Sequence, residues 1–403
     1  MLRGRALAAK ETMKLLSVDV RNYRAIKESK FRFTDDLGRV RPVTVIAGPN
    51  GSGKTSILWA IVQTLRGVLG YRTNDVPAPT RDDMRKEQTT SEWIKEPPSI
   101  QVKATVQFDS EEQEAIPALL KILGQGEPPK LDRGELTVNW IYPPNIDESS
   151  GVRRPSWTAS VAPTKRNVRL WLSARKLAIQ AWRRREDNFE IRFLDQIGGI
   201  KFFPQERVLK RRALSEDRGP GLSITSEPIA PDAEGETGSE PPRDREESLT
   251  DILYRLSHYV RTKGPGLPDA QNWEKRIQDL FHQICGPKEY LGYHYRGETD
   301  PVGAPLFRDG DQEYPITQVA DGESVILEYI TEMIYPSPLS HSIILIDEPE
   351  LHLHPAWIRQ LYLALPKIGE SNQYILTTHS PELRDRAASD GALIDLGPLG
   401  TTL

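Results

Sequence analysis

A phosphate-binding loop is the feature of this sequence that most constrains its fold. Residues 48–55 read Gly-Pro-Asn-Gly-Ser-Gly-Lys-Thr and match the pattern G-x-x-x-x-G-K-[ST] in full. The loop follows an apolar, β-branched run at 43–47 and opens a stretch with helical spacing at 54–69, the strand–loop–helix context that such a loop needs. The alternative is an ordinary glycine turn that carries a lysine. The context favours an α/β domain that binds nucleotide phosphates.

The loop supplies most of the predicted nucleotide contacts. Glycines let the backbone approach an anion closely, and the helix N-terminus adds positive potential. Lys54 can place its charge on the β- and γ-phosphates, and Thr55 can hold a metal ion. ATP and Mg²⁺ are therefore the predicted cofactors. The predicted binding residues of the loop are Asn50, Gly51, Ser52, Gly53, Lys54, Thr55 and Ser56.

A second acidic motif follows the apolar run at 343–346. We expect Asp347 to reach the metal edge of the phosphate loop and Glu348 to polarise a water aimed at the γ-phosphate. The alternative is a strand that simply ends in solvated acids. The long separation of Asp347 from Lys54 excludes compact P-loop families in which the second acid follows soon after the loop.

Strands and helices alternate along the chain, which indicates the α/β class. The sequence patterns predict strands at 15–20, 29–33, 43–47, 99–108, 135–142, 156–161, 199–203, 342–346, 373–377 and 392–396. They predict helices at 54–69, 110–124, 167–186, 248–262, 269–285, 322–335 and 355–367, and a hairpin around Asp309-Gly310-Asp311. Residues 72–98 are expected to be a loop.

Composition suggests how the chain is divided. We expect an N-terminal extension at 1–12 and a first lobe at 13–212, with an inserted region at about 71–198. Residues 213–247 are rich in Pro, Gly, Ser and acids, so they are expected to form a flexible acidic linker. A second lobe is expected at 248–403.

Charge and cysteine content exclude several classes of protein. The 403 residues include 53 Lys and Arg against 57 Asp and Glu, a net charge of −4, which argues against a uniformly basic nucleic-acid binder. One cysteine, Cys285, excludes a disulfide framework and a cysteine-based zinc site within one chain. The sequence shows neither a membrane-length apolar run nor the apolar core of a signal peptide, so we expect a cytoplasmic protein with no membrane partner.

The order of the motifs resembles the ABC ATPase fold. Between the phosphate loop and the acidic strand lies Val-Ala-Asp-Gly-Glu at 319–323, and after that strand comes Thr-Thr-His-Ser-Pro at 377–381. More narrowly, the chain resembles the heads of SMC, RecF and OLD-type ATPases, and stand-alone ATPases of prokaryotic anti-phage defence such as those of PARIS, Septu or retron loci. This implies a two-lobed α/β head with a P-loop core sheet, antiparallel strands in the first lobe and a helical insertion. The short linker implies that no long coiled coil is present.

The resemblance implies roles for three further residues. Arg24 lies where the family often places an arginine beside the nucleotide. Gln205 resembles the glutamine that senses Mg²⁺ and the attacking water. His379 resembles the switch histidine that contacts the γ-phosphate. The alternatives are a surface arginine, a loop glutamine and a capping or core histidine.

The helix start at Ala320, Asp321, Gly322 and Glu323 resembles the family's signature motif, which contacts the γ-phosphate held by another subunit. Ala320 replaces the usual serine, and the loss of that hydroxyl implies a contact weaker by on the order of 1–3 kcal/mol. The run at 347–355 matches the Asp-Glu-Pro-Glu-x-His-Leu-His-Pro pattern of OLD-like ATPases, near an expected dimer interface. His352 and His354 within it could bind a metal, but no third ligand is apparent.

A basic stretch at 165–185 contains eight Lys or Arg residues and no acid. We expect a helix whose basic side chains face solvent or a partner, namely Arg169, Arg175, Lys176, Arg183, Arg184 and Arg185. A solvated helix, a docking surface for an acidic partner and a DNA or RNA contact remain alternatives.

These inferences lead to one main hypothesis, an ATPase whose subunits associate around ATP and control a separately encoded effector, such as a Toprim or HNH nuclease, in anti-phage defence. Few residues of the sequence follow His379, so we expect the Toprim domain of OLD-type nucleases to be absent from this chain. The alternatives are a slow or trigger-dependent ATPase that acts as a scaffold or sensor holding an effector, and a RecF-like repair ATPase that binds DNA. The effector, the trigger and the number of subunits stay open.

Overall fold

The computed structural model describes residues 13–66, 99–142, 156–160, 165–184, 188–205, 249–263, 272–295, 303–334 and 339–397. The predictions for 1–12, 72–98 and 213–247 lie outside the described residues. The chain divides into two units, one formed by 1–207 together with 336–403 and the other by 208–335. The first unit therefore contains both the phosphate loop and the C-terminal residues. The boundaries of the two lobes predicted above stay predictions.

An antiparallel sheet forms one part of the first unit. Its strand order is β2-β1-β4-β5-β6, and every neighbouring pair is antiparallel. Buried residues alternate with more exposed ones along β4, so one face of the strand carries the apolar side chains. The strands are β1 (Lys14–Tyr23), β2 (Ile26–Arg32), β4 (Ile100–Gln107), β5 (Glu135–Tyr142) and β6 (Ser156–Ala159).

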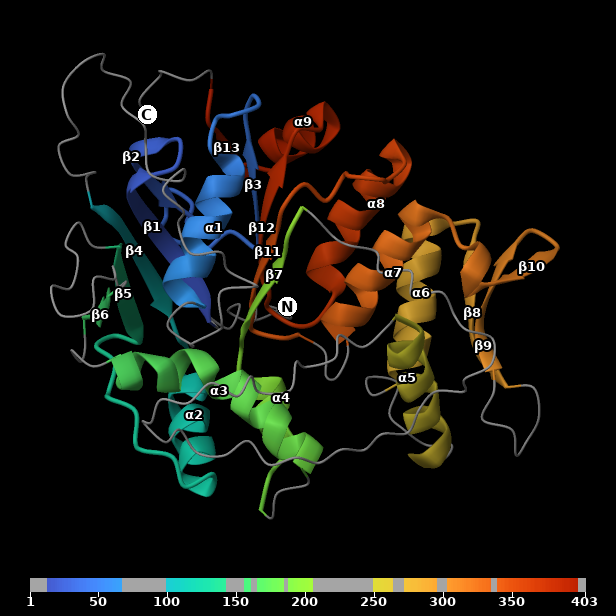
Figure 1. Cartoon of the computed structure of the whole chain (residues 1–403), viewed down its shortest axis with the longest axis horizontal. Helices are drawn as coiled ribbons and strands as arrows, with labels where there is room; N and C mark the ends of the chain where they lie inside the picture. The colour runs from blue at the N-terminus through green and yellow to red at the C-terminus, as the bar shows by residue number, and fades with distance from the viewer. Residues whose placement is uncertain are drawn as a thin grey trace, which may run out of the picture. The chain divides into compact units, whose positions relative to one another are not determined.

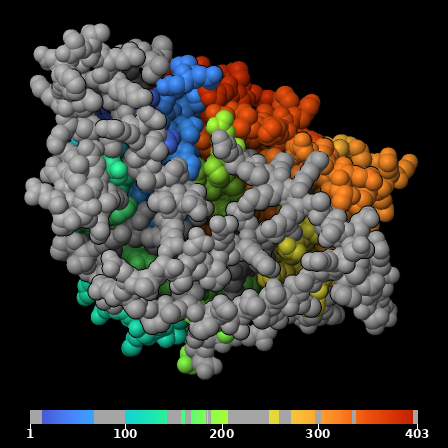
Figure 2. Space-filling model, in the orientation of Figure 1, coloured from blue at the N-terminus to red at the C-terminus, as the bar shows by residue number. Residues whose placement is uncertain are grey.

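A parallel sheet forms the other part, with the order β13-β3-β12-β11-β7. Every residue of β3, β11 and β12 is buried, as expected for strands covered on both faces. The strands are β3 (Val43–Ala47), β7 (Ile200–Phe203), β11 (Ile343–Ile346), β12 (Gln373–Thr378) and β13 (Leu393–Asp395). Pairing of β3 with β12 and β13 brings the N-terminal part of the unit beside the C-terminal part, blue beside red in Figures 1 and 2.

Helix α1 packs against both sheets, and further helices of the first unit pack against the sheets and against one another. Helix α1 (Lys54–Leu65) contacts β1, β4 and β5 of the antiparallel sheet and β12 of the parallel sheet (Figure 1). Helix α9 (Pro381–Ser389) contacts β3, β13 and α8 (Pro355–Ala364), which continues into the 3-10 turn η4 (Leu365–Lys367). Helices α2 (Ser110–Ile122), α3 (Lys165–Arg184) and α4 (Arg192–Gln196) contact one another.

In its described residues, the second unit combines three α-helices with a small antiparallel sheet. The sheet has the order β10-β9-β8, and Phe307 of β9 packs in its core against Phe281, Tyr290 and Tyr314. The predicted hairpin turn is present, with Gly310 in the left-handed region at φ 60°. The elements are α5 (Leu249–Lys263), α6 (Trp273–Cys285), β8 (Glu289–Tyr295), β9 (Gly303–Asp309), β10 (Gln312–Pro315), η3 (Ile316–Gln318) and α7 (Asp321–Ile334).

The predicted α/β fold, with an antiparallel sheet besides the P-loop sheet, is confirmed. Two α-helices, α4 and α9, one strand, β8, and the 3-10 turn η3 are missing from the sequence prediction. Strand β8 was missed because its sequence, Glu-Tyr-Leu-Gly-Tyr-His-Tyr, lacks a simple apolar alternation. Helix α9 is polar, although Ser380 caps its N-terminus by accepting from the Leu383 N–H at 3.4 Å. None of the helices in the described ranges is long and apolar enough to cross a membrane.

The basic helix α3 differs from its prediction at Arg175. The side chain is buried, and its guanidinium donates to the carbonyl oxygens of Leu194 at 2.7 Å and Ile197 at 2.6 Å. Burial lowers the pKa of Arg175 to about 10. The predicted exposure of Arg175 is therefore wrong, because its side chain ties α3 to the segment that leads into β7. The exposed basic residues of the helix are Arg169, Lys176 and Arg184.

Replacing Arg175 should destabilise the first unit. Arg175→Met removes two charge-assisted hydrogen bonds and leaves two buried carbonyls without them, so we expect the free energy of unfolding to fall by about 2–4 kcal/mol. Arg184→Met, at an exposed position of the same helix, is the matched control. Denaturant unfolding of the two variants measures the difference, and equal stabilities would contradict the structural role of Arg175.

Candidate functional site

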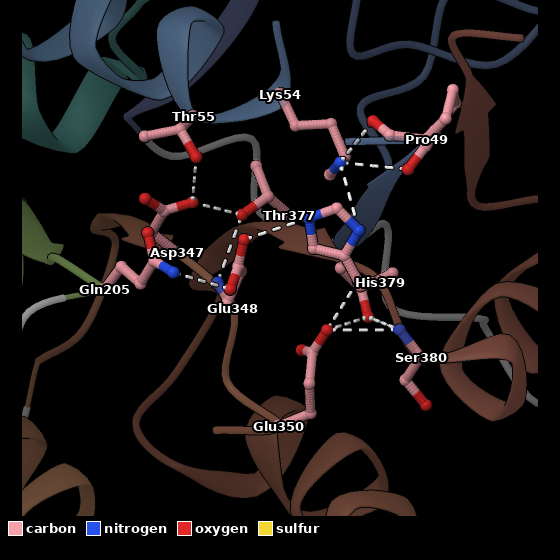
Figure 3. A network of polar contacts seen from close by, with 12 residues as sticks. Pro49, Lys54, Thr55, Gln205, Asp347, Glu348, Glu350, Thr377, His379 and Ser380 are labelled. Carbon is pink, nitrogen blue, oxygen red and sulfur yellow. Dashed lines mark hydrogen bonds and ion pairs between the residues drawn. The ribbon is translucent and has the colours of Figure 1, made fainter. Parts of the chain in front are cut away.

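The site lies where four neighbouring parallel strands end. In the order β3-β12-β11-β7, Ala47 pairs with Thr378, Leu376 with Ile346, and Ile346 with Phe203. Parallel pairing directs all four carboxyl ends to one edge of the sheet, which is where α/β sheets bind ligands. The loops that follow carry the phosphate loop, His379, the Asp347–Glu350 run and Gln205 (Figure 3). Residues far apart in the sequence are thereby brought together.

A cavity of about 610 Å³ opens at this edge. Most of the predicted site residues contribute to its wall. It is lined by Arg24, Ala25, Asn50, Gly51, Gly53, Lys54, Thr55, Ser56, Gln205, Glu348 and His379. Arg24 comes from the β1–β2 turn, with its guanidinium carbon 5.4 Å from the centre of the Tyr23 ring and 6.0 Å from that of Trp59.

The phosphate loop has a shape that requires glycine. Gly51 and Gly53 adopt left-handed backbone angles, with φ of 77° and 95°. A Cβ on Gly53 would lie 3.2 Å from Cγ1 of Ile26, so the cradle has little room for a side chain there. Helix α1 begins directly after Gly53, and its first N–H groups have no carbonyl partner within the helix. This cradle fits a phosphate group.

Lys54 lies folded against its own loop. Its ammonium donates to the carbonyl oxygens of Gly48 at 2.9 Å and Pro49 at 3.0 Å. Burial lowers the pKa of Lys54, and the nearby carboxylates of Glu348, Asp347 and Glu350 oppose that shift. The ammonium therefore lies at the cavity on two carbonyl contacts that a phosphate oxygen could replace.

Asp347 and Thr55 place two oxygen atoms side by side beneath the loop. The Thr55 hydroxyl donates to Oδ1 of Asp347 at 3.1 Å, and the Thr377 hydroxyl donates to the same oxygen. Asp347 is buried at the end of β11. A carboxylate next to a hydroxyl is an oxygen donor set that suits Mg²⁺. The predicted metal ligands Thr55 and Asp347 are thus in contact.

Glu348 has a constrained backbone and a crowded carboxylate. Its φ of 48° is in the left-handed region, and its N–H donates to the Thr377 hydroxyl at 3.1 Å. Such strain gathers at functional sites. Nε2 of Gln205 donates to Oε2 at 2.9 Å, while Nε2 of His379 lies 3.1 Å from Oε1. Burial raises the pKa of Glu348, and proximity to His379 is the largest opposing effect.

His379 bridges the lysine and the glutamate. Its Nδ1 lies 3.4 Å from the Lys54 ammonium, and its Nε2 faces Glu348 (Figure 3). Glu350 and Thr377 are two further members of this network that the sequence analysis did not single out. Both stand inside motifs that it quoted, Glu350 in Asp-Glu-Pro-Glu and Thr377 in Thr-Thr-His-Ser-Pro, but their contacts depend on strand pairing.

Among the side chains that the structure describes, none joins the two histidines of the 347–355 run in a metal centre. Nδ1 of His354 accepts from the Ala356 N–H at 3.2 Å and caps α8. Within the described ranges, no group of three or more His, Cys, Asp or Glu side chains is placed to hold a metal ion.

The predicted signature motif belongs to the second unit and begins α7. Ala320 and Asp321 are exposed, whereas the Glu323 side chain is buried. The Glu323 carboxylate binds Lys288, accepts from Oη of Tyr314 at 3.3 Å and accepts from the Ala320 N–H at 3.2 Å. The Glu323 carboxylate therefore holds the start of α7, and the contact of this helix start with a nucleotide stays a prediction.

Comparisons with known proteins support the same fold and chemistry. The family described as "AAA domain, putative AbiEii toxin, Type IV TA system" matches residues 119–385, and the family "AAA ATPase domain" matches residues 13–194. Both descriptions name an AAA domain, the second of them as an ATPase, and together the two matches span the site.

Two curated relatives are similar over short stretches. The chain is 37% identical over 78 residues to "Retron Ec83 probable ATPase" of Escherichia coli, covering 17% of this chain and 14% of the relative. It is 34% identical over 93 residues to "Retron Vc95 probable ATPase" of Vibrio cholerae, covering 21% of this chain and 18% of the relative. The matches thus span less than a fifth of either relative.

Solved structures show a similar fold. An Smc head bound to the C-terminal winged-helix domain of ScpA aligns with a TM-score of 0.52 at 15% identity, covering 92% of this chain and 90% of that one. An Smc head domain with an extended coiled coil, bound to the C-terminal domain of ScpA from Pyrococcus furiosus, aligns with a TM-score of 0.50 at 13% identity, covering 95% and 93%.

The first family match covers well over half of the chain, and the fold agrees with that of SMC heads. The chain therefore belongs to the AAA-domain ATPase family described as "AAA domain, putative AbiEii toxin, Type IV TA system", with an SMC-like head fold.

Proposed function

We propose that this chain binds ATP with Mg²⁺ in the cavity and hydrolyses it, and that subunits associate around the nucleotide to control a separately encoded effector. The observation that carries the proposal is the convergence of Lys54, Glu348 and His379 on a cavity that the phosphate loop lines. A cradle, a cation and a carboxylate that could act as a base are the parts that hydrolysis of a phosphoanhydride needs.

The residues would divide the chemistry among them. Backbone N–H groups of the loop and the Lys54 ammonium would hold the β- and γ-phosphates, while Thr55 and Asp347 would hold Mg²⁺. A bound Mg²⁺ supplies charge neutralisation at the phosphate oxygens. Glu348 would accept a proton from the attacking water, since its raised pKa makes it a stronger base than an ordinary glutamate.

Gln205 and His379 would hold that base in place. Gln205 donates to one oxygen of Glu348, and its amide oxygen could also serve the metal as the sequence analysis predicts. His379 faces the other oxygen of Glu348 and would meet the γ-phosphate. The water would thus be aligned by groups from β7, β11 and β12.

Two observations support the association of subunits and the control of an effector: an exposed helix start and the names of two relatives. The exposed start of α7, with Ala320 and Asp321, is a surface that could meet a nucleotide on another subunit. The retron relatives are named as probable ATPases, which supports a role in defence alongside other components. A Toprim or HNH nuclease would be a fitting effector.

A scaffold or sensor that hydrolyses ATP slowly is the second candidate. Ala320 favours it, because the usual serine of the motif would add a hydroxyl donor to the phosphate. A trigger would then release the effector.

Two variants separate binding from turnover. Glu348→Gln should lower ATP turnover by about 100-fold or more while ATP binding survives, because it removes the base but leaves the cradle. Lys54→Met should weaken ATP binding by about tenfold or more, because it removes a charge-assisted contact. Calorimetric titration measures ATP binding, and the rate of phosphate release measures ATP turnover. Full turnover by Glu348→Gln would overturn the role of Glu348.

Turnover should depend on pH through Glu348. The base works when ionised, so turnover is lost as pH falls through its pKa, and burial moves that loss to a higher pH than for an ordinary glutamate. The measurement is turnover at saturating ATP from about pH 4 to pH 9, with ATP binding followed in parallel. A flat profile over this range would contradict the assignment.

Restoring a serine tests the signature helix. In a Glu348→Gln background, Ala320→Ser should lower the concentration for half-association with Mg·ATP by about 5- to 150-fold, the range expected for 1–3 kcal/mol. Light scattering measures association. Because serine could also cap α7, thermal stability without ATP is the control. An unchanged concentration for half-association would contradict the place of Ala320 in an interface between subunits.

A further inference from the structure

We infer that Glu350 is a positioning residue for the hydrolysis proposed above: its carboxylate fixes the backbone of His379 so that the imidazole stays between Lys54 and Glu348. The inference rests on the proposed function. It adds a residue that neither touches the expected phosphates nor lines the cavity, yet determines where a residue of the cavity lies.

One oxygen of Glu350 gathers three donors from the end of β12. Oε1 accepts from the Thr378 hydroxyl at 2.7 Å, the His379 N–H at 2.5 Å and the Ser380 N–H at 3.1 Å (Figure 3). Glu350 itself follows β11 in the turn after Asp347 and Glu348. Its carboxylate therefore joins the loop that carries the acids to the loop that carries the histidine.

These contacts constrain the imidazole on its backbone side. Beyond them, the His379 ring has two polar neighbours, Lys54 at 3.4 Å from Nδ1 and Glu348 at 3.1 Å from Nε2. Ser380 next caps α9, so the backbone is fixed in both directions from His379. Loss of the Glu350 contacts would free this backbone and let the ring leave the base. A displacement of about 1 Å can cost roughly 100-fold in rate.

The second oxygen suggests how to test the geometry separately from the charge. Oε2 is buried and makes no hydrogen bond to any residue that the structure describes. In Glu350→Gln the amide oxygen can take the place of Oε1 and keep all three donors, with the NH₂ group in the place of Oε2. Glu350→Ala removes the contacts. Both variants remove the same negative charge. In the parent chain, the charge of Glu350 raises the pKa of Glu348 and that of Lys54.

The experiment compares these two variants with the parent chain. We expect Glu350→Ala to lower kcat by about 10- to 100-fold, with ATP affinity changed less than about threefold. Glu350→Gln should keep kcat within about threefold, because the three donors keep an oxygen acceptor in the same place. Thr378→Val removes one donor and should lower kcat less than Glu350→Ala does.

A second readout does not depend on activity. The chain has seven histidines, and His379→Asn identifies the His379 ring resonance in NMR spectra by its absence. In the ATP-free chain, Glu350→Ala should move or broaden that resonance, and Glu350→Gln should leave it near its original position. Retained ATP affinity shows that Glu350→Ala is folded.

Three outcomes are informative. Equal losses of kcat in Glu350→Ala and Glu350→Gln would mean that charge matters and would overturn the positioning role. Parent-like kcat and an unchanged His379 resonance in Glu350→Ala would overturn it as well. If Glu348→Gln retains full turnover, the proposed function itself fails, whereas an inactive Glu348→Gln beside a fully active Glu350→Ala defeats this inference alone.

Discussion

The parallel pairing of β12 with β3 on one side and β11 on the other is the constraint on which the site depends. It places the phosphate loop, the acidic pair and His379 at one edge, although Lys54 and Asp347 lie at opposite ends of the sequence. Strand β7 adds Gln205 by pairing with β11. A helix dipole and glycine-rich backbone alone would bind an anion, but neither could supply a base or a metal ligand.

The ends of the strands are further joined by a polar network that crosses between them. The Thr377 hydroxyl of β12 donates to the Asp347 carboxylate and accepts from the Glu348 N–H, so one side chain orders both acids. Glu350 makes the reverse connection, from the acidic loop to the backbone around His379. Buried acceptors are costly without donors, so each contact stabilises the fold while it fixes the site. The polar contacts at the strand ends therefore position the two acids and His379.

Much of this arrangement could be predicted from the sequence, because the main signals are local. The strand–loop–helix context identified Lys54 and Thr55, and the apolar strand before Asp347 identified the acidic pair. The roles of Thr377 and Glu350 could not be predicted, since they depend on which strands are neighbours. Arg175 was misread for a related reason: a basic run indicates a polar helix face, but not that one guanidinium turns inward to bond the Leu194 and Ile197 carbonyls.

The most direct test of the account is the stoichiometry of nucleotide binding. Calorimetric titration of the chain with a non-hydrolysable ATP analogue, with and without Mg²⁺, measures how many sites exist and whether a metal completes them. The account predicts one nucleotide per chain, bound more tightly with Mg²⁺ because Thr55 and Asp347 lie together at the cavity. No binding, or binding that is indifferent to Mg²⁺, would contradict it.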